Sequence, residues 1–230
     1  MALRFEEIDW QQTDQGEISL RRRHDLVTDS DVYEVKLGEE FLMSSLFTAA
    51  EIELSHLALA EIDRPRLRVM VGGLGLGYTA QAALADPRVA EVTVVELNEP
   101  VLEWHRRGLL PDVVELGSDP RCQLVQDDFF RLAAAEPERT YDAILLDIDH
   151  SPHHALSPTH QAFYTAPSLA ALSRHLTDDG VFALWSDDRP DQVFEAVLSE
   201  VFSTVAAHVV EFANPLTGGV SSNTVYVARQ

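Results

Sequence analysis

From residue 66 onward, short apolar runs rich in β-branched residues alternate with longer stretches of helical period. This alternation is typical of strand-helix-strand units, which assemble into a parallel sheet. We expect strands at 67–71, 91–97, 122–125, 141–146 and 181–185. The run 141–146 is apolar apart from Asp142 near its start, as buried parallel strands usually are.

Between these strands, the helical period predicts helices at 78–85, 100–107, 129–135, 159–175 and 191–201. Two final strands at 208–212 and 224–228 flank a Gly-rich turn and are typical of a hairpin. The predicted fold class is therefore α/β, a doubly wound sheet of about seven strands with an antiparallel end.

The first sixty residues have a different pattern. Short antiparallel strands are expected at 5–10, 16–23 and 32–37, separated by turn signals. Thr48 followed by Glu51 resembles a capping box, which would open an amphipathic helix running to about Ala60. We therefore expect a small N-terminal β appendage with a connecting helix in residues 1–60, and a nucleoside-binding domain in residues 61–230.

The charge balance limits the partners of this chain. Lysine and arginine total 17 against 38 acidic residues, a formal net charge of −21. Such a surface repels phosphate backbones and anionic lipid, so we expect neither a nucleic acid nor a membrane partner. The lone Cys122, the lack of a long apolar stretch and an N-terminus unlike a signal peptide predict a cytoplasmic location.

Three successive strand ends carry groups suited to a nucleoside. Closely spaced glycines follow the first strand, and Gly73, Gly75 and Gly77 would let backbone N–H groups approach a ligand. Glu96, with Asn98 just beyond it, ends the second strand, where a carboxylate can accept both ribose hydroxyls. Asp127 and Asp128 follow the third strand and precede two aromatic residues suited to cover an adenine ring.

Each signal also has a purely structural interpretation. The glycines are compatible with a tight strand-to-helix turn, and Glu96 with a solvated carboxylate. One of Asp127 and Asp128 is easily explained as the N-cap of the next helix. Together, however, the three signals favour an adenosine-containing ligand.

The fourth strand ends in a group of residues that could act on the ligand. Asp147, Asp149 and His150 would lie at the carboxyl edge, where a carboxylate can take a proton from an attacking amine or stabilise a sulfonium. One aspartate has the alternative role of capping the loop. Several histidines follow, but without a strict ligand spacing, so we expect no metal site.

These motifs resemble the spermidine-synthase-like branch of the class I S-adenosylmethionine-dependent transferases, over nearly the whole chain. The resemblance implies a small N-terminal β domain before a Rossmann-like, methyltransferase-type domain. It also implies a homodimer and a role in polyamine biosynthesis. By the same resemblance, Glu96 binds the ribose, Asp127 binds the adenine and Asp147 lies at the transfer centre.

The chain also departs from the family pattern, mainly on the acceptor side. Gly75 replaces the aspartate of the first family loop, a carboxylate that helps to hold the aminopropyl amine. The loop from Asp147 to Ser151 keeps the first family aspartate and moves or loses the second. The family polyamine contacts are replaced near 40–47, and Trp185 stands where a glutamine is expected. We therefore place the acceptor pocket between residues 41–47 and the loops after Asp147 and Trp185.

The leading hypothesis is an alkyl transferase. Its donor would be decarboxylated S-adenosylmethionine or S-adenosylmethionine, and its acceptor a small amine, with aminopropyl transfer competing with methyl transfer to a small molecule. Asp147 is the candidate base, with Asp149 or His150 assisting and Tyr164 shaping the acceptor wall. A non-catalytic nucleoside-binding module is a further alternative. A nicotinamide-dependent oxidoreductase is disfavoured, because Gly73, Gly75 and Gly77 lack its Gly-x-Gly-x-x-Gly spacing.

Overall fold

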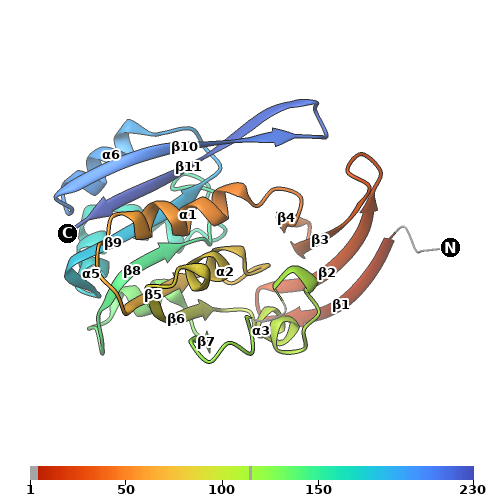
Figure 1. The fold of residues 1–230 in the computed structure, drawn as a ribbon, viewed down its shortest axis with the longest axis horizontal. Helices are drawn as coiled ribbons and strands as arrows, with labels where there is room; N and C mark the ends of the chain where they lie inside the picture. The colour runs from red at the N-terminus through yellow and green to blue at the C-terminus, as the bar shows by residue number, and fades with distance from the viewer. Residues whose placement is uncertain (1–4, 114–115) are drawn as a thin grey trace.

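The computed structural model describes residues 5–113 and 116–230, which form two sheets (Figure 1). The smaller sheet is antiparallel, and its strands run in chain order: β1 (Phe5–Thr13), β2 (Gly16–Asp25), β3 (Ser30–Leu37) and β4 (Glu40–Ser44). The first three strands confirm the sequence prediction. Strand β4 is an addition, because five residues are too few to show a clear period of two.

The larger sheet has seven strands in the order β10-β11-β9-β8-β5-β6-β7. Neighbours from β9 to β7 pair in parallel, whereas β10 and β11 pair antiparallel, as the sequence predicts. The bounds are β5 (Leu67–Gly72), β6 (Val89–Glu96), β7 (Cys122–Gln126), β8 (Tyr141–Leu146), β9 (Leu176–Ser186), β10 (Thr204–Asn214) and β11 (Gly219–Arg229).

Helices cover both faces of the larger sheet. In β5, Val69 and Val71 belong to a core cluster with Leu54 of the helix at Ala49–Ala60, whereas Met70 belongs to a second cluster with Leu169 of the helix at Ala166–Ser173. Alternate strand residues thus face opposite helix layers. The bounds of the helices are α1 (Ala49–Ala60), α2 (Tyr78–Ala85), α3 (Glu99–Arg106), α4 (Phe129–Ala134), α5 (Ala166–Ser173) and α6 (Gln192–Ser199). No helix of residues 5–113 and 116–230 is long and apolar enough to cross a membrane.

Two local predictions are corrected. The single helix expected at 159–175 is divided into a 3₁₀ turn (His160–Tyr164) and α5, because Pro167 fits only the first turn of a new helix. The capping box at the start of α1 does not form. Thr48 occupies the N-cap position without a side-chain capping hydrogen bond.

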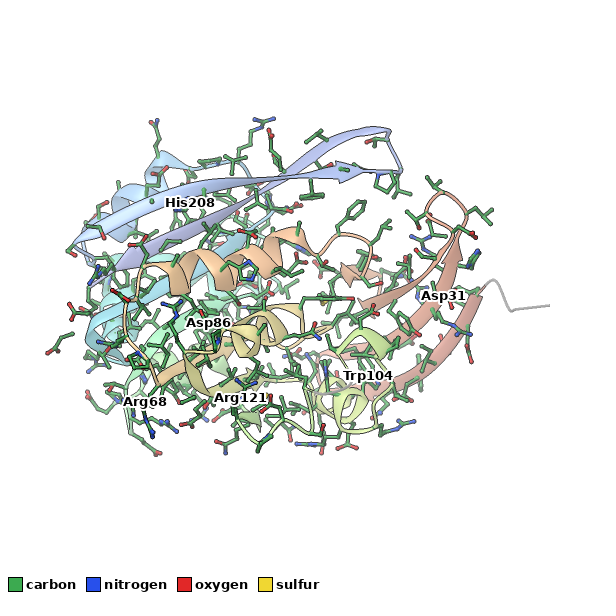
Figure 2. The ribbon with its side chains drawn as sticks, viewed as in Figure 1. Asp31, Arg68, Asp86, Trp104, Arg121 and His208 are labelled. Carbon is green, nitrogen blue, oxygen red and sulfur yellow. The ribbon has the colours of Figure 1, made fainter. Side chains whose placement is uncertain are left out.

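The smaller sheet packs against the body of the protein through α3. Trp104 of α3, which is labelled in Figure 2, is fully buried. Its Nε1 donates a 2.7 Å hydrogen bond to Asp9 Oδ2 of β1. Ile18 and Leu20 of β2 join the core cluster that contains Leu54. The smaller sheet therefore lies beside the carboxyl ends of the parallel strands (Figure 1). A domain division at residue 60 stays a prediction.

Candidate active site

A cavity of about 430 Å³ opens at the carboxyl edge of the parallel strands, against β3 and β4. The structure brings eight predicted site residues to its walls: Gly73, Gly75, Glu96, Asn98, Asp127, Asp128, Asp147 and His150. Three others, Gly77, Asp149 and Tyr164, are absent from its lining. The edge position agrees with the general rule that ligands of doubly wound sheets bind where the strands end.

The glycine turn after β5 is shaped by close contacts within the protein. Gly73 has a φ of 92°, and a Cβ there would lie 2.1 Å from the backbone oxygen of Asp147. At Gly75, a Cβ would lie 2.2 Å from Met43 Sδ. These glycines are therefore required by packing as well as by the approach of a ligand.

Gly77 lies outside the cavity lining and shapes the start of α2. This residue caps α2 with a φ of 90°, and a Cβ there would lie 2.7 Å from His105 Cε1. His105 is buried, and its Nε2 lies 2.9 Å from the backbone oxygen of Gly75. Burial lowers the pKa of His105, which favours a neutral ring that donates from Nε2 and holds the turn in place.

Glu96 is fixed at the end of β6 between the glycine turn and Asn98. Its Oε2 accepts a 3.0 Å hydrogen bond from the Leu74 N–H, and its Oε1 accepts one of 2.8 Å from the Asn98 N–H. The residue is only 8% exposed. A carboxylate has about four lone-pair positions, so Glu96 can still accept hydrogen bonds from ligand hydroxyls.

Asp127 and Asp128 have different roles after β7. Asp128 Oδ1 accepts hydrogen bonds from the N–H groups of Phe130 and Arg131, at 2.9 and 3.2 Å, and so caps α4. The N-cap alternative is therefore correct for Asp128. Asp127 instead accepts a hydrogen bond from the Arg131 guanidinium, which lowers the pKa of Asp127 and keeps it ionised.

Asp147 lies where β8 ends, beside the glycine turn. The Thr79 hydroxyl donates a 2.6 Å hydrogen bond to its Oδ2. Burial raises the pKa of Asp147 to about 6, while the hydrogen bond from Thr79 acts in the opposite direction. A carboxyl group with this pKa, at a cavity wall, is suited to accept a proton near neutral pH.

Asp149 and Tyr164 lie outside the cavity lining and hold the loop after β8 together, so their part in the reaction stays a prediction. Asp149 is buried, and its Oδ2 accepts a 2.6 Å hydrogen bond from the Tyr164 hydroxyl. Its Oδ1 accepts a 2.7 Å hydrogen bond from the Leu156 N–H and lies 2.9 Å from His160 Nδ1. Asp149 therefore supports His160, which does line the cavity and packs on Phe130 with ring centroids 4.0 Å apart and the rings tilted by 30°.

Glu51 lines the cavity, although its sequence position predicts only a role in a helix capping box. It lies in the first turn of α1, is 8% exposed and lines the cavity with Asp147. Burial, and then the charge of Asp147, raise the pKa of Glu51 to about 8. The available sequence signal was its position: Glu51 precedes Leu54 and Ala58 by three and seven residues, which places an acid on the apolar face of the helix.

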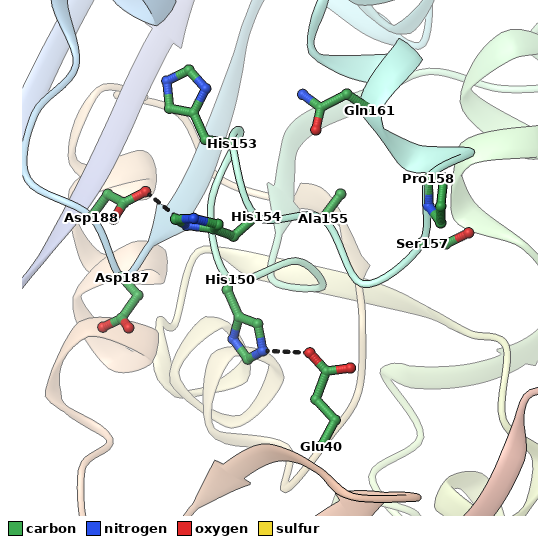
Figure 3. Close-up of a pocket in the computed structure, with 10 residues that line it drawn as sticks. All are labelled: Glu40, His150, His153, His154, Ala155, Ser157, Pro158, Gln161, Asp187 and Asp188. Atoms are coloured by element: carbon green, nitrogen blue, oxygen red, sulfur yellow. Dashed lines mark hydrogen bonds and ion pairs between the residues drawn. The ribbon is translucent and has the colours of Figure 1, made fainter.

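A second, open pocket of about 620 Å³ adjoins the cavity, and His150 and Ser157 line both (Figure 3). Its walls come from the start of β4, the loop after β8 and the loop after β9. These are nearly the segments where the sequence places the acceptor. His150 Nε2 lies 3.3 Å from Glu40 Oε1, and His154 Nδ1 lies 3.5 Å from Asp188 Oδ2. Over the described part of the chain, no group of three His, Cys, Asp or Glu side chains is arranged to hold a metal ion.

Comparison with known proteins identifies the family. The model of the spermine/spermidine synthase domain matches residues 48–213. The chain belongs to the spermine/spermidine synthase family. The family region thus begins at the N-cap of α1 and includes Glu51, Glu96, Asp127 and Asp147, the acidic groups of the cavity.

Individual relatives of the chain are similar over part of its length. Polyamine aminopropyltransferase 2 of Pseudomonas aeruginosa is 29% identical over 161 residues. The match covers 66% of this chain and 44% of that relative. Putrescine N-methyltransferase 3 of Nicotiana tabacum is 29% identical over 126 residues. The match covers 55% of this chain and 31% of that relative. The chain thus spans less than half the length of these curated relatives.

The fold matches as well. The crystal structure of spermidine synthase from Thermotoga maritima aligns with a TM-score of 0.75 at 19% identity, covering 97% of this chain and 72% of that one. This likeness confirms the predicted α/β fold with its small N-terminal sheet.

Proposed function

We propose that this protein transfers an aminopropyl group from decarboxylated S-adenosylmethionine to a small amine. One observation carries the proposal. The cavity is lined by carboxylates and by no lysine or arginine from the described residues: Glu51, Glu96, Asp127, Asp128 and Asp147. Decarboxylated S-adenosylmethionine is a sulfonium with a primary ammonium and no carboxylate, so its charge complements these walls.

The nucleoside would lie across three strand ends. Asp127 would accept a hydrogen bond from the adenine amino group, with Phe130 against the ring, and Glu96 would accept from the ribose hydroxyls. The alkyl chain would then extend past Gly73 toward Asp147 at the next strand end. Strand order supports this path, because β7, β6, β5 and β8 are successive neighbours in the sheet.

The reaction requires the protein mainly to position the donor and the acceptor and to remove one proton from the acceptor. The neutral acceptor nitrogen attacks the aminopropyl carbon, the carbon–sulfur bond breaks, and methylthioadenosine leaves with the bonding electron pair. The acceptor arrives as an ammonium, and Asp147 would take its proton so that the lone pair becomes nucleophilic. The open acidic pocket at Glu40, Asp187 and Asp188 offers a cationic acceptor a place beside His150.

Methyl transfer to an amine is the second candidate, favoured by the similarity to a relative named putrescine N-methyltransferase. Its donor, S-adenosylmethionine, carries an α-carboxylate that would lie near Glu51 and Asp147 with no lysine or arginine on the described walls to balance it. The cavity therefore favours the decarboxylated donor. A homodimer and a cytoplasmic location stay predictions.

The test is a survey of acceptors. Purified protein is incubated with decarboxylated S-adenosylmethionine and, separately, with diamines of three to six carbons, longer polyamines and a neutral alcohol of matched length. We expect an aminopropylated product with one or more amines and none with the alcohol. Failure of every amine, with nucleoside binding intact, would reject the transferase and favour a binding module.

A further inference from the structure

The end of the cavity near Asp147 contains a carboxylate that the mechanism above does not use. Glu51 is 8% exposed and lines the cavity beside Asp147. Among the described residues, no lysine, arginine or histidine pairs with it, and the only donor to its carboxylate is its own backbone N–H. A buried carboxylate without a cation is costly, and a cationic ligand would remove that cost.

The neighbourhood of Glu51 makes this end of the cavity distinctly anionic. Asp147 and Asp187 both act on Glu51 electrostatically and raise its pKa. Thr79 bridges the two elements, because its hydroxyl lies 2.6 Å from Asp147 Oδ2 and 3.3 Å from the backbone oxygen of Glu51. Thr79 of α2 thus contacts the backbone of α1 at Glu51 and the carboxylate of Asp147 just after β8, and both residues line the cavity.

The glycine turn, by contrast, contributes no charge there. The space beyond Gly75 is filled by Met43 of β4, whose Sδ lies 3.0 Å from the Leu76 N–H. A side chain at position 75 would meet that sulfur. Any carboxylate that complements Asp147 must therefore come from another element, and Glu51 of α1 lines the cavity close enough for Asp147 to act on it electrostatically.

We infer that Glu51 binds the terminal ammonium of the donor's alkyl chain beside Asp147, and that Glu51 is the residue that selects a donor without an α-carboxylate. The inference rests on the proposed function, because it requires a sulfonium nucleoside in the cavity. Glu51 acts by charge: it attracts the ammonium and repels a carboxylate. Asp147 remains available to the acceptor once the ammonium is held.

The experiment is a set of calorimetric titrations with three ligands that share the adenosine part. Decarboxylated S-adenosylmethionine carries the ammonium, S-adenosylmethionine adds the carboxylate, and methylthioadenosine lacks both. Wild type is compared with Glu51→Gln, which keeps the shape and removes the charge. The matched control is Glu53→Gln on the same helix, where the exposed carboxylate only pairs with His56 at 3.1 Å.

In wild type, we expect decarboxylated S-adenosylmethionine to bind more tightly than S-adenosylmethionine. Glu51→Gln should weaken binding of the decarboxylated donor roughly tenfold to a hundredfold, the loss usual for a charge-assisted hydrogen bond. Methylthioadenosine binding should change by less than about twofold, since that ligand lacks the ammonium. The preference over S-adenosylmethionine should shrink, and Glu53→Gln should behave as wild type.

A second measurement uses wild type alone. Ligand ammonium favours the ionised form of Glu51, so binding of the decarboxylated donor at pH 7 should release more protons than binding of methylthioadenosine. The release appears as a dependence of the binding heat on the ionisation enthalpy of the buffer. This readout holds even if Glu51→Gln folds poorly.

The outcomes separate the two proposals. If wild type binds none of the three nucleosides, the proposed function fails and the inference fails with it. If wild type binds them but Glu51→Gln weakens all three equally, and proton release is the same for both ligands, Glu51 is structural and only the inference is overturned. If Glu51→Gln weakens binding of the decarboxylated donor alone, the result supports both the proposed function and the inference.

Discussion

The Thr79 hydroxyl donates a 2.6 Å hydrogen bond to Asp147 Oδ2, joining the first turn of α2 to the end of β8. This contact lowers the pKa of Asp147, whereas burial raises it to about 6. The glycine turn brings the two elements close enough for the contact, because Gly73 packs against the Asp147 backbone. The basicity of the candidate base is therefore set partly by a residue of another element.

Replacing Thr79 tests that relationship. In Thr79→Val the hydrogen bond is lost and the shape is nearly kept, so the pKa of Asp147 should rise. The acidic limb of the rate-against-pH profile should then move to higher pH. Thr79→Ser retains the hydroxyl and should keep the wild-type profile. If the acidic limb of Thr79→Val stays at the wild-type pH, that limb does not report the ionisation of Asp147.

Asp147→Asn tests the base itself. The amide keeps the size of the side chain but cannot accept the acceptor's proton. Turnover should fall by about two to four orders of magnitude, the usual contribution of a positioned general base. Donor affinity should change much less than turnover. If the dissociation constant of the donor rises while the maximal rate is kept, Asp147 holds the donor and is no base.

Asp149→Asn should behave differently, although it lies only two residues away. The buried carboxylate accepts from Tyr164 and the Leu156 N–H, so its loss should destabilise the fold by about 1–3 kcal/mol. Turnover at a temperature where the variant is folded should stay near wild type. Urea unfolding and steady-state kinetics on the same preparation give both values. If Asp149→Asn is folded but inactive, Asp149 takes part in the reaction and is more than a structural residue.

The pH dependence of stability is a further consequence of Glu51. Its folded pKa of about 8 exceeds its ordinary value of 4.5, so the folded state binds more protons than the unfolded state between these values. This contribution to stability is fully present below about pH 4.5 and is lost as pH rises through about 8.

The measurement is the free energy of unfolding of wild type and Glu51→Gln from pH 4.5 to 8.5. Wild type should lose stability relative to the variant across this window. Taking the difference removes the effect of carboxylates such as Asp25, whose pKa is lowered to about 2. Parallel curves would contradict a raised pKa at Glu51.

Most of the fold was predictable because local signals and tertiary structure agree. The helix at 78–85 and the strand at 141–146 have the predicted bounds, since a glycine turn precedes the helix and the strand is apolar apart from Asp142. Where two local signals compete, the prediction was wrong. Pro167 divides the helix expected at 159–175, because a proline inside a helical period can also open a new helix.

The site was predictable only where a strand end places a residue. Glu96, Asp127 and Asp147 each end a strand, so the topology brings them to one cavity. Glu51 and Met43 come from α1 and β4, and nothing in the local sequence fixes how those elements lie over the glycine turn. Asp149 shows the converse: its position after β8 resembles that of Asp147, but its side chain turns into the loop.

The most direct test of the account is the nucleoside product formed when both donors compete. The protein is incubated with equal concentrations of S-adenosylmethionine and decarboxylated S-adenosylmethionine and an excess of an accepted amine. The products are then separated by chromatography. We expect methylthioadenosine as the main nucleoside, formed in step with the aminopropylated amine. S-adenosylhomocysteine as the main product, with a methylated amine, would contradict it.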